Sequence, residues 1–373
     1  MRILMHCIYF PPEVGGLESH VYHLCRALAA RGHQVGIVTS MSQPGLPAHE
    51  VVEGVEVWRT WFPSRSPSGW VAHALGSLPR ALQAARKADV LHAQAFASIP
   101  PLQAARGVTG APLVATFHTS HFLVRAERPG WKPVLRALVR TPDHALAASR
   151  EIADVAEALA PGTAVEPVTN GVDTTLFRRV APALELSKGT LRIVVPRRLF
   201  PKNGVDVMVR ALPLLLEDHP ELEMVVIGDG PQRGELERLA GTLGVAGRVR
   251  WLGARPNAEM PGLLSSADLA VIPSRMEATS VAALEAMACE LPVVASNVGG
   301  LPEIVDGTVG ALSPPDDPPG LARTLSDLLS SADLPALGRA ARARVVTHWS
   351  NDRLAERHLE IYRELLDRRR RRG

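Results

Sequence analysis

At 373 residues the chain is long enough to form two compact domains, and its composition, 46% hydrophobic and 21% charged residues, is that of a globular protein. A net charge of +3 is too small to indicate a protein that binds nucleic acid. No run of about 18 apolar residues occurs, so the sequence predicts no membrane-spanning helix.

Short apolar runs that indicate strands alternate with helix-length segments along the chain. In the first half these runs cover residues 1–10, 33–40, 55–58, 89–93, 112–118, 144–149 and 164–171. A helix is expected over Glu18–Arg31, where Val21, Leu24 and Leu28 are spaced for one buried face. Strands that alternate with helices predict a parallel sheet with crossover helices.

The same order of runs begins again in the second half. Its expected strands cover residues 191–199, 222–230, 248–253, 269–274, 292–296 and 310–314. Helices are expected between them, for example over Val205–Glu217 and Gln232–Leu243. We therefore predict an α/β fold of two Rossmann-like, doubly wound domains, 1–178 and 191–350, which are joined by a polar linker at 179–190 and face a central cleft.

The three cysteines, Cys7, Cys25 and Cys289, lie far apart and form no C-x-x-C pair. We expect all three to be reduced residues in or near the core of a cytosolic protein. Met1 leads directly into an apolar strand, without the charged segment and the cleavage site of a signal peptide.

A glycine pair, Gly15-Gly16, stands between the first predicted strand and the helix that follows it. Paired glycines let the backbone approach a ligand closely, and free N–H groups at a helix start favour an anion. A plain strand–helix turn would account for the same residues, so this loop alone does not establish a binding site.

A basic loop follows the first predicted strand of the second half, with Arg197, Arg198 and Lys202 inside RRLFPKNG at 197–204. Two or three cations at the carboxyl end of a strand suit a diphosphate, which arginine binds with two N–H groups and lysine binds as a point charge. A basic surface loop is the alternative, but the position at the expected cleft favours the diphosphate.

Two carboxylates, Glu277 and Glu285, stand on either side of a turn of small residues that opens an apolar helix. If Thr279, Ser280 and Val281 begin this helix, their N–H groups point into the cleft and can hold phosphate. Glu285 is then placed to reach a ribose, and Glu277 to reach a sugar hydroxyl. A first-turn acid together with a solvated glutamate would be the purely structural explanation.

These motifs together resemble the large family of retaining GT-B glycosyltransferases of family 4, also called glycosyl transferases group 1, which includes phosphatidylinositol mannosyltransferases and other cell-envelope enzymes. The family signature, E-x7-E with a helix reading LEAMA, is similar to the segment from Glu277 onwards, EATSVAALEAMA. The resemblance covers nearly the whole chain and also includes PPEVGGLESHV, NGVDTTLF, RRLFPKNGVD, VIGDGP, WLGARP and HWSNDRLAERHLEIYREL. Each segment is weak alone, whereas seven in the right order are strong.

The resemblance implies a retaining glycosyltransferase that moves a hexose, or a derivative of one, from a UDP- or GDP-linked sugar to a sugar, lipid or cell-envelope acceptor. It implies that Arg198 and Lys202 bind the donor diphosphate, Glu285 the ribose and Glu277 the transferred sugar. The other implied site residues are His118 near the reacting carbon, Thr279, Ser280 and Val281 at the distal phosphate, Gly15 and Gly16 near the diphosphate, Gly253 to Arg255 along the nucleobase, and Glu18 on the acceptor side. The catalytic assignments are His118, Glu277, Arg198 and Lys202. The last helix, in residues 351–373, is implied to return to the first domain.

The sequence departs from the family pattern in three places. The usual Gly-Phe-Gly after the first glutamate is Ala278-Thr279-Ser280, which leaves the choice of donor sugar open, and the usual glycine before the phosphate arginine is Arg197. The usual glycine after Cys289 is Glu290, which we expect to be a turn change without chemical meaning. No two aspartates stand two positions apart, so there is no D-x-D pair to hold a divalent ion, and we expect neither a metal nor another cofactor.

Two other functions fit the same residues. A GT-B-fold nucleotide-sugar 2-epimerase would also place acids around a sugar and would need no acceptor, and a non-catalytic sugar-nucleotide binder would show no turnover. His118 has a structural alternative too, because a lone histidine at a strand end is more often a hydrogen-bonding core residue. For the transferase we expect front-face attack, with the leaving phosphate helping to deprotonate the acceptor and without Glu277 as a covalent nucleophile.

Cations recur at four-residue spacing at Arg128, Lys132, Arg136 and Arg140, and on one helix they would form a basic stripe. Basic residues beside an aromatic such as Trp131 suit a helix that lies on an anionic membrane. The expected location is therefore cytoplasmic, with peripheral contact at the inner face of the plasma membrane. A solvated basic face and, for the terminal arginine run, a solvated tail are the alternatives.

Overall fold

The computed structural model describes residues 1–13, 16–118, 120–185, 189–277 and 279–371. The chain divides into two compact units, which are described separately. The first consists of Met1–Gly171 together with Asn351–Gly373, and the second of Val172–Ser350. The second unit thus begins a few residues before the expected boundary at 178, and the segment expected to be a linker, 179–190, lies within it.

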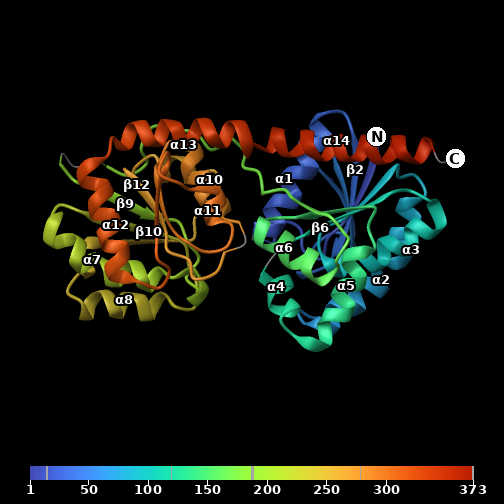
Figure 1. Ribbon diagram of the computed structural model, residues 1–373, viewed down its shortest axis with the longest axis horizontal. Coiled ribbons are helices and arrows are strands. Elements are labelled where there is room, and N and C mark those ends of the chain that lie inside the picture. Colours follow the sequence, from blue (N-terminus) through green and yellow to red (C-terminus); the bar gives the residue numbers. More distant parts are fainter. Residues whose placement is uncertain (14–15, 119, 186–188, 278, 372–373) are drawn as a thin grey trace. The chain divides into compact units, whose positions relative to one another are not determined.

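The strands of the first unit form one sheet in the order β3-β4-β2-β1-β5-β6-β7-β8 (Figure 1). Neighbouring strands are parallel, except that β3 pairs antiparallel with β4 at one edge. Every run expected to be a strand in this half is one, and β3 is the strand that the sequence analysis missed. The bounds are β1 Arg2–His6, β2 Gln34–Ser40, β3 His49–Val52, β4 Val55–Thr60, β5 Val90–Ala93, β6 Leu113–Phe117, β7 His144–Ala147 and β8 Val165–Pro167.

The helices of the first unit pack on this sheet. They are α1 Gly16–Ala30, α2 Pro67–Ala85, α3 Ile99–Thr109, α4 Ser120–Ala126, α5 Lys132–Arg140, α6 Arg150–Leu159 and α14 Asn351–Arg370, with short 3₁₀ turns η1 Phe96–Ser98 and η2 Pro129–Trp131. One core cluster joins the apolar faces of α1 and α14 to β1, β2 and β4. The expected amphipathic helix over Glu18–Arg31 is therefore confirmed as α1.

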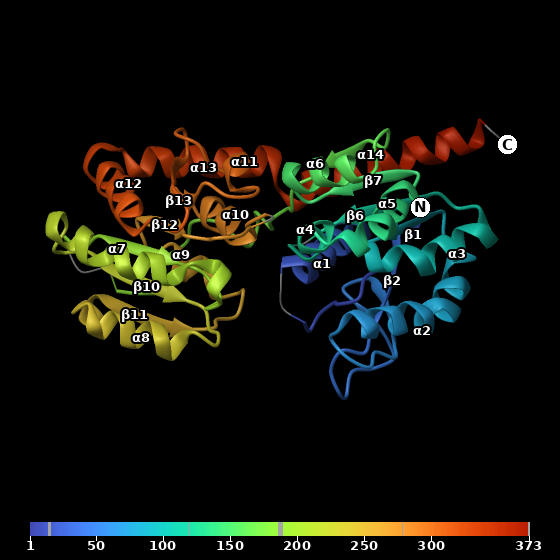
Figure 2. The same ribbon diagram turned by 60° about the horizontal axis from the view of Figure 1, so that its bottom comes forward.

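The last helix, α14, is an integral part of the first unit, in which it packs against α1 (Figure 2). Leu354, Leu359 and Tyr362 are buried in the cluster shared with α1. Arg357 of α14 binds Glu166 of β8 at 2.6 Å. His144 and Arg357 together lower the pKa of Glu166 to about 2. The terminal arginine run is helical as far as Arg370, so it is not wholly a frayed tail.

The second unit contains one parallel sheet in the order β11-β10-β9-β12-β13-β14. Its strands are β9 Arg192–Val195, β10 Glu223–Ile227, β11 Val249–Gly253, β12 Leu269–Ile272, β13 Val293–Ser296 and β14 Gly310–Ser313. All were expected from the sequence. The helices are α7 Val205–Asp218, α8 Arg233–Thr242, α9 Met260–Leu264, α10 Val281–Ala288, α11 Leu301–Ile304, α12 Pro318–Ser331 and α13 Leu334–His348, with 3₁₀ turns η3 Pro201–Asn203 and η4 Ala246–Arg248.

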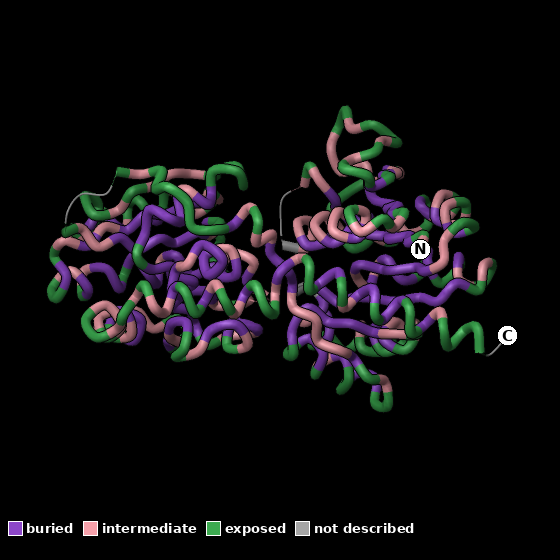
Figure 3. The backbone as a smooth tube through the Cα atoms, turned by 90° about the horizontal axis from the view of Figure 1, so that it is seen from above, coloured by how far each residue is buried: buried purple, intermediate pink, exposed green. Residues whose placement is uncertain are grey.

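Two apolar layers enclose the second sheet. One cluster contains residues of α7, α8 and α12, and the other contains residues of α9, α10, α11 and α13. The buried backbone at the centre of each unit is surrounded by half-buried and exposed segments in Figure 3. The fold is thus the predicted pair of doubly wound sheets. Within the described residues, no helix is both long and apolar enough to cross a bilayer.

Candidate active site

The basic loop after β9 rests on the loop that follows β10. The N–H of Leu199 donates to the carbonyl of Asp229 at 3.0 Å. Gly228 has a φ of +145°, and a Cβ at this position would lie 2.1 Å from the carbonyl oxygen of Arg197. The close approach of these two loops at the carboxyl ends of neighbouring strands therefore requires a glycine.

Arg198 and Lys202 are the cations of this loop that are open to a ligand. Both are exposed, and among the described residues neither forms an ion pair. Arg198 lies over the ring of Phe200, 5.7 Å from its centroid. Partial burial lowers the pKa of Lys202, and Glu277 acts in the opposite direction. Two cations without a carboxylate partner fit the predicted diphosphate site.

The loop after β12, which carries Glu277, is tied to the basic loop. The N–H of Arg275 donates to the carbonyl of Lys202 at 2.8 Å. The guanidinium of Arg275 binds both carboxylate oxygens of Asp206 in α7, at 2.7 and 2.8 Å. Gly204, with a φ of +63°, allows the backbone to approach Pro273, whose carbonyl oxygen would lie 1.9 Å from a Cβ. The two loops thus form one connected site.

Glu277 is held by Arg197, which the sequence analysis had noted only as a departure from the family pattern. Nη2 of Arg197 donates to Oε2 of Glu277 at 2.5 Å. The same nitrogen lies 2.8 Å from Oδ1 of Asn203 and 2.8 Å from Oγ of Ser274. Only the density of cations in RRLFPK could have indicated this role from the sequence.

Helix α10 begins at Val281, as the predicted phosphate site requires. Ser280 is its N-cap, and its hydroxyl accepts from the N–H of Ala283 at 3.2 Å. The N–H of Val281 enters none of the described hydrogen bonds and is available to an anion. Thr279 is half-buried, whereas Ala278 lies outside the described residues.

Glu285 lies within α10, and the residues next to it on this helix are buried. Desolvation raises the pKa of its carboxyl group to about 8. Among the described residues no hydrogen-bond donor or cation pairs with this carboxyl group. Glu285 is half-buried, and a carboxyl group desolvated without a partner is unfavourable in the free protein.

We predict that Glu285→Gln stabilises the free protein at pH 8 while it weakens nucleotide binding. A folded-state pKa raised above the ordinary value favours the fold fully below about pH 4.5, and this contribution is lost as the pH rises through 8. Removing the acid should therefore raise the free energy of unfolding at pH 8 by about 2–4 kcal/mol. Loss of the carboxylate should weaken binding of UDP or GDP by roughly 1.5–3 kcal/mol.

Denaturant unfolding at pH 6 and pH 8 and titration calorimetry measure the two effects. Glu217→Gln, at an exposed glutamate of α7, is the matched control and should change neither quantity. Unchanged nucleotide affinity in Glu285→Gln would contradict the ribose assignment.

The segment predicted to line the nucleobase follows β11. Gly253 has a φ of +73°, which favours glycine, and its carbonyl accepts from the N–H of Gly228 at 2.9 Å. This bond joins the segment to the loop that supports Arg197. Arg255 is exposed and lies 3.7 Å from the carboxylate of Glu259.

Glu290, the other departure, follows α10 with a φ of +63°. Glycine is favoured at this position after a helix because it lacks a Cβ. The side chain of Glu290 lies 4.0 Å from Arg342 of α13. Glu290 is thus a feature of the helix end, and no described contact joins it to Arg198, Lys202 or Glu277.

In the first unit, His118 follows β6 and is buried, with 3% of its surface exposed. Its Nε2 lies 3.0 Å from Oε1 of Gln94, so Nε2 carries the proton and donates it. Burial lowers the pKa of His118 to about 3, and His358 acts in the same direction. At pH 7 this residue is a neutral imidazole whose tautomer is set by Gln94. The described contacts agree with both the catalytic and the structural alternative.

A buried chain of hydrogen bonds continues from Gln94 to α14. Its Nε2 lies 3.3 Å from Nδ1 of His92, and that nitrogen lies 2.6 Å from the hydroxyl of Tyr362. His20 of α1 lies against His118, with ring centroids 4.7 Å apart, and neither nitrogen of His20 has a described partner. This cluster was not predicted from the sequence, in which its members appear as single polar residues within apolar runs.

The glycine loop is only partly described. Gly15 lies outside the described residues, and Gly16 begins α1. Glu18 is half-buried in the first turn of α1, where a helix favours an acid. The acceptor-side role of Glu18 therefore remains a prediction.

The predicted basic stripe is not one helix. Arg128 precedes the turn η2, and α5 begins only at Lys132. Pro129 and Pro133 cause this break, because proline is accepted in the first turn of a helix but removes an N–H donor farther along it. The expectation of a continuous stripe from Arg128 is thus wrong.

The two later members of the stripe contact the end of α6. Arg136 donates through Nε to the carbonyl of Leu159 at 2.8 Å. Arg140 donates through Nη2 to the carbonyl of Pro161 at 3.4 Å. Arg128 and Lys132 are exposed and make no such contact within the described residues.

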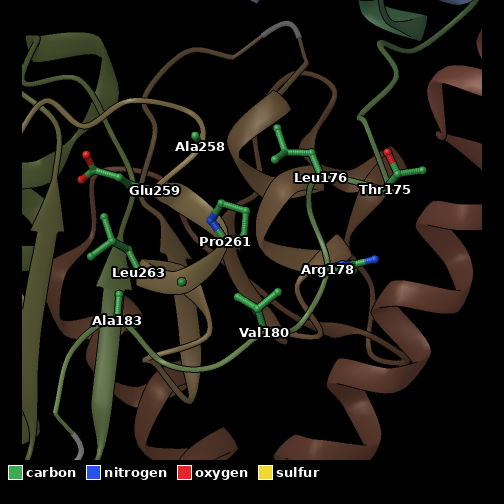
Figure 4. A pocket seen from close by; sticks show the side chains of 10 residues that line it. Thr175, Leu176, Arg178, Val180, Ala183, Ala258, Glu259, Pro261 and Leu263 are labelled. Atoms are coloured by element: carbon green, nitrogen blue, oxygen red, sulfur yellow. The ribbon is translucent and has the colours of Figure 1, made fainter.

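The three cysteines are buried and free, as expected. The described part of the chain contains no group of three metal-ligating side chains. A hollow of about 460 Å³ lies in the second unit between residues 175–183 and α9 (Figure 4). It is lined by Thr175, Leu176, Arg178, Val180, Ala183, Ala258, Glu259, Pro261, Gly262 and Leu263. None of the predicted donor-binding residues lines this hollow.

Two family models match the chain in succession, "Glycosyltransferase Family 4" over residues 14–176 and "Glycosyl transferases group 1" over residues 178–344. The glycogen synthase of Mycobacterium tuberculosis is 31% identical over 97% of this chain and 94% of its own length. The phosphatidyl-myo-inositol mannosyltransferase of Mycolicibacterium smegmatis is 31% identical over 94% of this chain and 91% of its own. The solved structure of sucrose-phosphate synthase from Thermosynechococcus elongatus matches with a TM-score of 0.85 at 23% identity, covering 98% of this chain and 99% of that one.

Proposed function

Because the chain belongs to the family 4 glycosyltransferases, the glycosyl transferases group 1, we propose that it moves a hexose or hexose derivative from a nucleotide-diphosphate sugar to an acceptor with retention of anomeric configuration. One observation carries the proposal. Arg198 and Lys202, cations without a carboxylate partner, and Glu285, a carboxyl group without a described partner, occupy segments that follow β9 and β12, which are neighbours in the sheet. A nucleotide diphosphate would supply the missing partner of each.

In the proposed mechanism, the protein acts mainly on the leaving group. Negative charge grows on the diphosphate as the bond to the sugar breaks, and Arg198, Lys202 and the N–H of Val281 stabilise it. A phosphate oxygen takes the proton of the acceptor hydroxyl on the same face of the sugar, which retains the configuration. Glu277 binds a sugar hydroxyl and is not the covalent nucleophile. This assignment agrees with the ion pair of Glu277 and Arg197.

A donor panel tests the function. UDP-, GDP- and ADP-linked hexoses are screened by thermal shift, and the donors that bind are incubated with sugar and lipid acceptors while products are followed by mass spectrometry. We expect at least one donor to raise Tm and to be consumed in the presence of an acceptor. The relatives from Mycobacterium tuberculosis and Mycolicibacterium smegmatis are named as a glycogen synthase and a mannosyltransferase, so the 2-epimerase is not favoured. NMR that shows epimerisation of the donor without any acceptor would overturn the proposal.

We predict that transfer activity survives removal of divalent metal ions. The two unpaired cations and the helix N-terminus provide positive charge that a Mg²⁺ ion supplies in other transferases. Initial rates should be equal in EDTA, in EDTA followed by excess Mg²⁺ and in untreated buffer. Complete loss of turnover in chelator with recovery on addition of Mg²⁺ or Mn²⁺ would rule out the metal-free mechanism.

We further propose that the acceptor is a lipid or a cell-envelope precursor and that the first unit meets an anionic membrane from the cytoplasmic side. The relative from Mycolicibacterium smegmatis is named for a lipid acceptor. Apolar side chains are exposed at Trp61 (64%), Val71 (58%) and Leu75 (68%). Trp61 packs beside Gly76 of α2, 3.6 Å from the position of a Cβ, so it adjoins the helix that carries the other two. Large apolar side chains exposed together favour an interfacial surface.

We predict that Arg128→Gln with Lys132→Gln weakens co-sedimentation with anionic vesicles at low salt. Each cation near an anionic surface contributes about 1 kcal/mol, so the pair supplies about 2 kcal/mol. Arg136 and Arg140 are left intact because they bind carbonyl groups at the end of α6. The terminal arginines are removed in a parallel variant truncated after Asp367, since they alone can attract anionic lipid. Wild-type protein that stays in the supernatant with vesicles would contradict the membrane proposal and would not affect the proposed transfer reaction.

A further inference from the structure

The guanidinium of Arg197 joins three segments of the second unit. Its Nη2, which has two hydrogens to donate, lies within hydrogen-bond distance of Asn203 in the basic loop and of Ser274 and Glu277 after β12. Its Nη1 lies 3.5 Å from the hydroxyl of Ser280, the N-cap of α10. One buried side chain therefore contacts the basic loop, the sugar-binding carboxylate and the start of the phosphate helix.

The partners of Arg197 leave it little freedom. Asn203 is 3% exposed, and its Nδ2 donates to the carbonyl of Arg198 at 2.6 Å, so its Oδ1 must face the guanidinium. Ser274 is fully buried. Because both acceptors are buried, they restrict the position of Arg197, and the contact through Oε2 restricts the orientation of Glu277.

Two polar atoms remain open in this arrangement. Oε1 of Glu277 enters none of the described hydrogen bonds. Nε of Arg197 is buried and also has no described acceptor. A buried N–H without an acceptor is unfavourable, so the site is complete only when a ligand or a water molecule supplies one. A sugar hydroxyl can both donate to a carboxylate and accept from an N–H group.

The cations of the loop thus differ in what they can do. Arg198 and Lys202 are exposed and unpaired, whereas the side chain of Arg197 is only 10% exposed and is paired with Glu277. An anionic diphosphate would gain little from a guanidinium already bound to a carboxylate. The charge of Arg197 is therefore directed at Glu277, and through Glu277 at the sugar.

We propose that Arg197 is a specificity-determining residue, which selects the transferred sugar by fixing Glu277 with Oε1 directed to one hydroxyl. The inference rests on the proposed function, since it assumes a nucleotide-sugar donor. Epimeric hexose donors differ in the direction of one hydroxyl, and a carboxylate held in one orientation discriminates between them. When Glu277 is released, several orientations become accessible and discrimination falls.

The test compares Arg197→Gln, Arg197→Lys, Glu277→Gln and the double variant with wild type. The ratio of kcat/KM for the preferred donor and its epimer is measured, together with the Kd of the free nucleotide diphosphate. We expect Arg197→Gln to lower the ratio about tenfold and to change the nucleotide Kd less than about threefold. The double variant should be no less selective than Glu277→Gln alone, because the two residues act as one unit. Arg197→Lys should recover part of the selectivity.

Arg238→Gln, at an exposed arginine of α8, is the matched control and should behave as wild type. Urea unfolding of each variant separates a folding defect from a site defect, because a purely structural residue would lower stability without altering the donor ratio. An unchanged donor ratio, or a loss of nucleotide affinity as large as that of Arg198→Ala, would overturn the assignment of Arg197. Wild-type protein that consumes no donor would instead overturn the proposed function.

Discussion

Replacing Arg198 or Lys202 by alanine is expected to lower turnover about 10²- to 10³-fold while the free energy of unfolding changes by less than about 1 kcal/mol. Both side chains are exposed and have no carboxylate partner, so the folded protein loses little when either is shortened. Arg198 gives up its contact with the ring of Phe200, which is worth about 0.5–1 kcal/mol at an exposed site. The full effect appears only when the diphosphate gains charge in the transition state.

The measurement is kcat/KM with saturating acceptor, combined with urea unfolding at pH 7.5. Lowered kcat with nearly unchanged KM would place the lost interaction in the transition state. Arg238→Ala removes an exposed cation elsewhere in the same unit and should leave the rate unchanged. A variant of Arg198 or Lys202 with normal turnover would show that this residue does not contact the phosphates.

Mild acid is expected to unfold the protein, since buried histidines cannot accept protons. Burial lowers the pKa values of His6, His20, His92, His118 and His358, to about 3 for His118 and about 4 for His358. The unfolded chain binds protons below the ordinary value of 6.5, whereas the folded chain does not. Stability is therefore complete above pH 6.5 and falls by about 1.4 kcal/mol per pH unit for each such histidine as the pH decreases.

Because the unfolded histidines are already half protonated at pH 6.5, each loses about 1 kcal/mol between pH 6.5 and 5.5, and the five together remove about 5 kcal/mol, which is comparable to the total stability of many proteins. The raised pKa of Glu285 has the opposite effect on stability over the same pH range, but this is one group against five histidines. Urea midpoints at pH 7.5, 6.5 and 5.5 measure the slope. His358→Gln should reduce the slope of stability against pH by the contribution of one histidine. A stability that is flat from pH 7.5 to 5.5 would contradict the buried, neutral cluster.

Much of the fold could be predicted because its strands are buried on both faces. The expected runs were continuous and apolar, as parallel strands between two helix layers require. The strand β3 was not predicted because it lies at the edge of the sheet, pairs antiparallel with β4 and has exposed residues, such as Val51, at alternate positions. The break before α5 differs from the expected continuous stripe because Pro129 and Pro133 limit where a helix can begin, whereas the four-residue spacing of cations does not depend on that limit.

The candidate site was only partly accessible from the sequence. Arg198, Lys202, Glu277 and Glu285 stand at positions set by strand ends and one helix start, which local patterns reveal. The role of Arg197 depends on the rotamers of Asn203, Ser274 and Ser280, which come from three separate segments. A sequence pattern shows that a cation is present but not which acceptor it contacts. The role of Arg197 at the site therefore could not be predicted from the sequence.

The return of α14 to the first unit has a consequence for the order of synthesis. Residues 1–171 leave the ribosome first but lack the helix that covers α1, whereas 172–350 form one uninterrupted unit. The second unit can therefore close while the first still exposes the apolar surface on which Leu354, Leu359 and Tyr362 will pack. The first unit should be the last to become protease-resistant during translation, and a premature stop near residue 350 should yield a folded second unit joined to an incomplete first unit that chaperones retain.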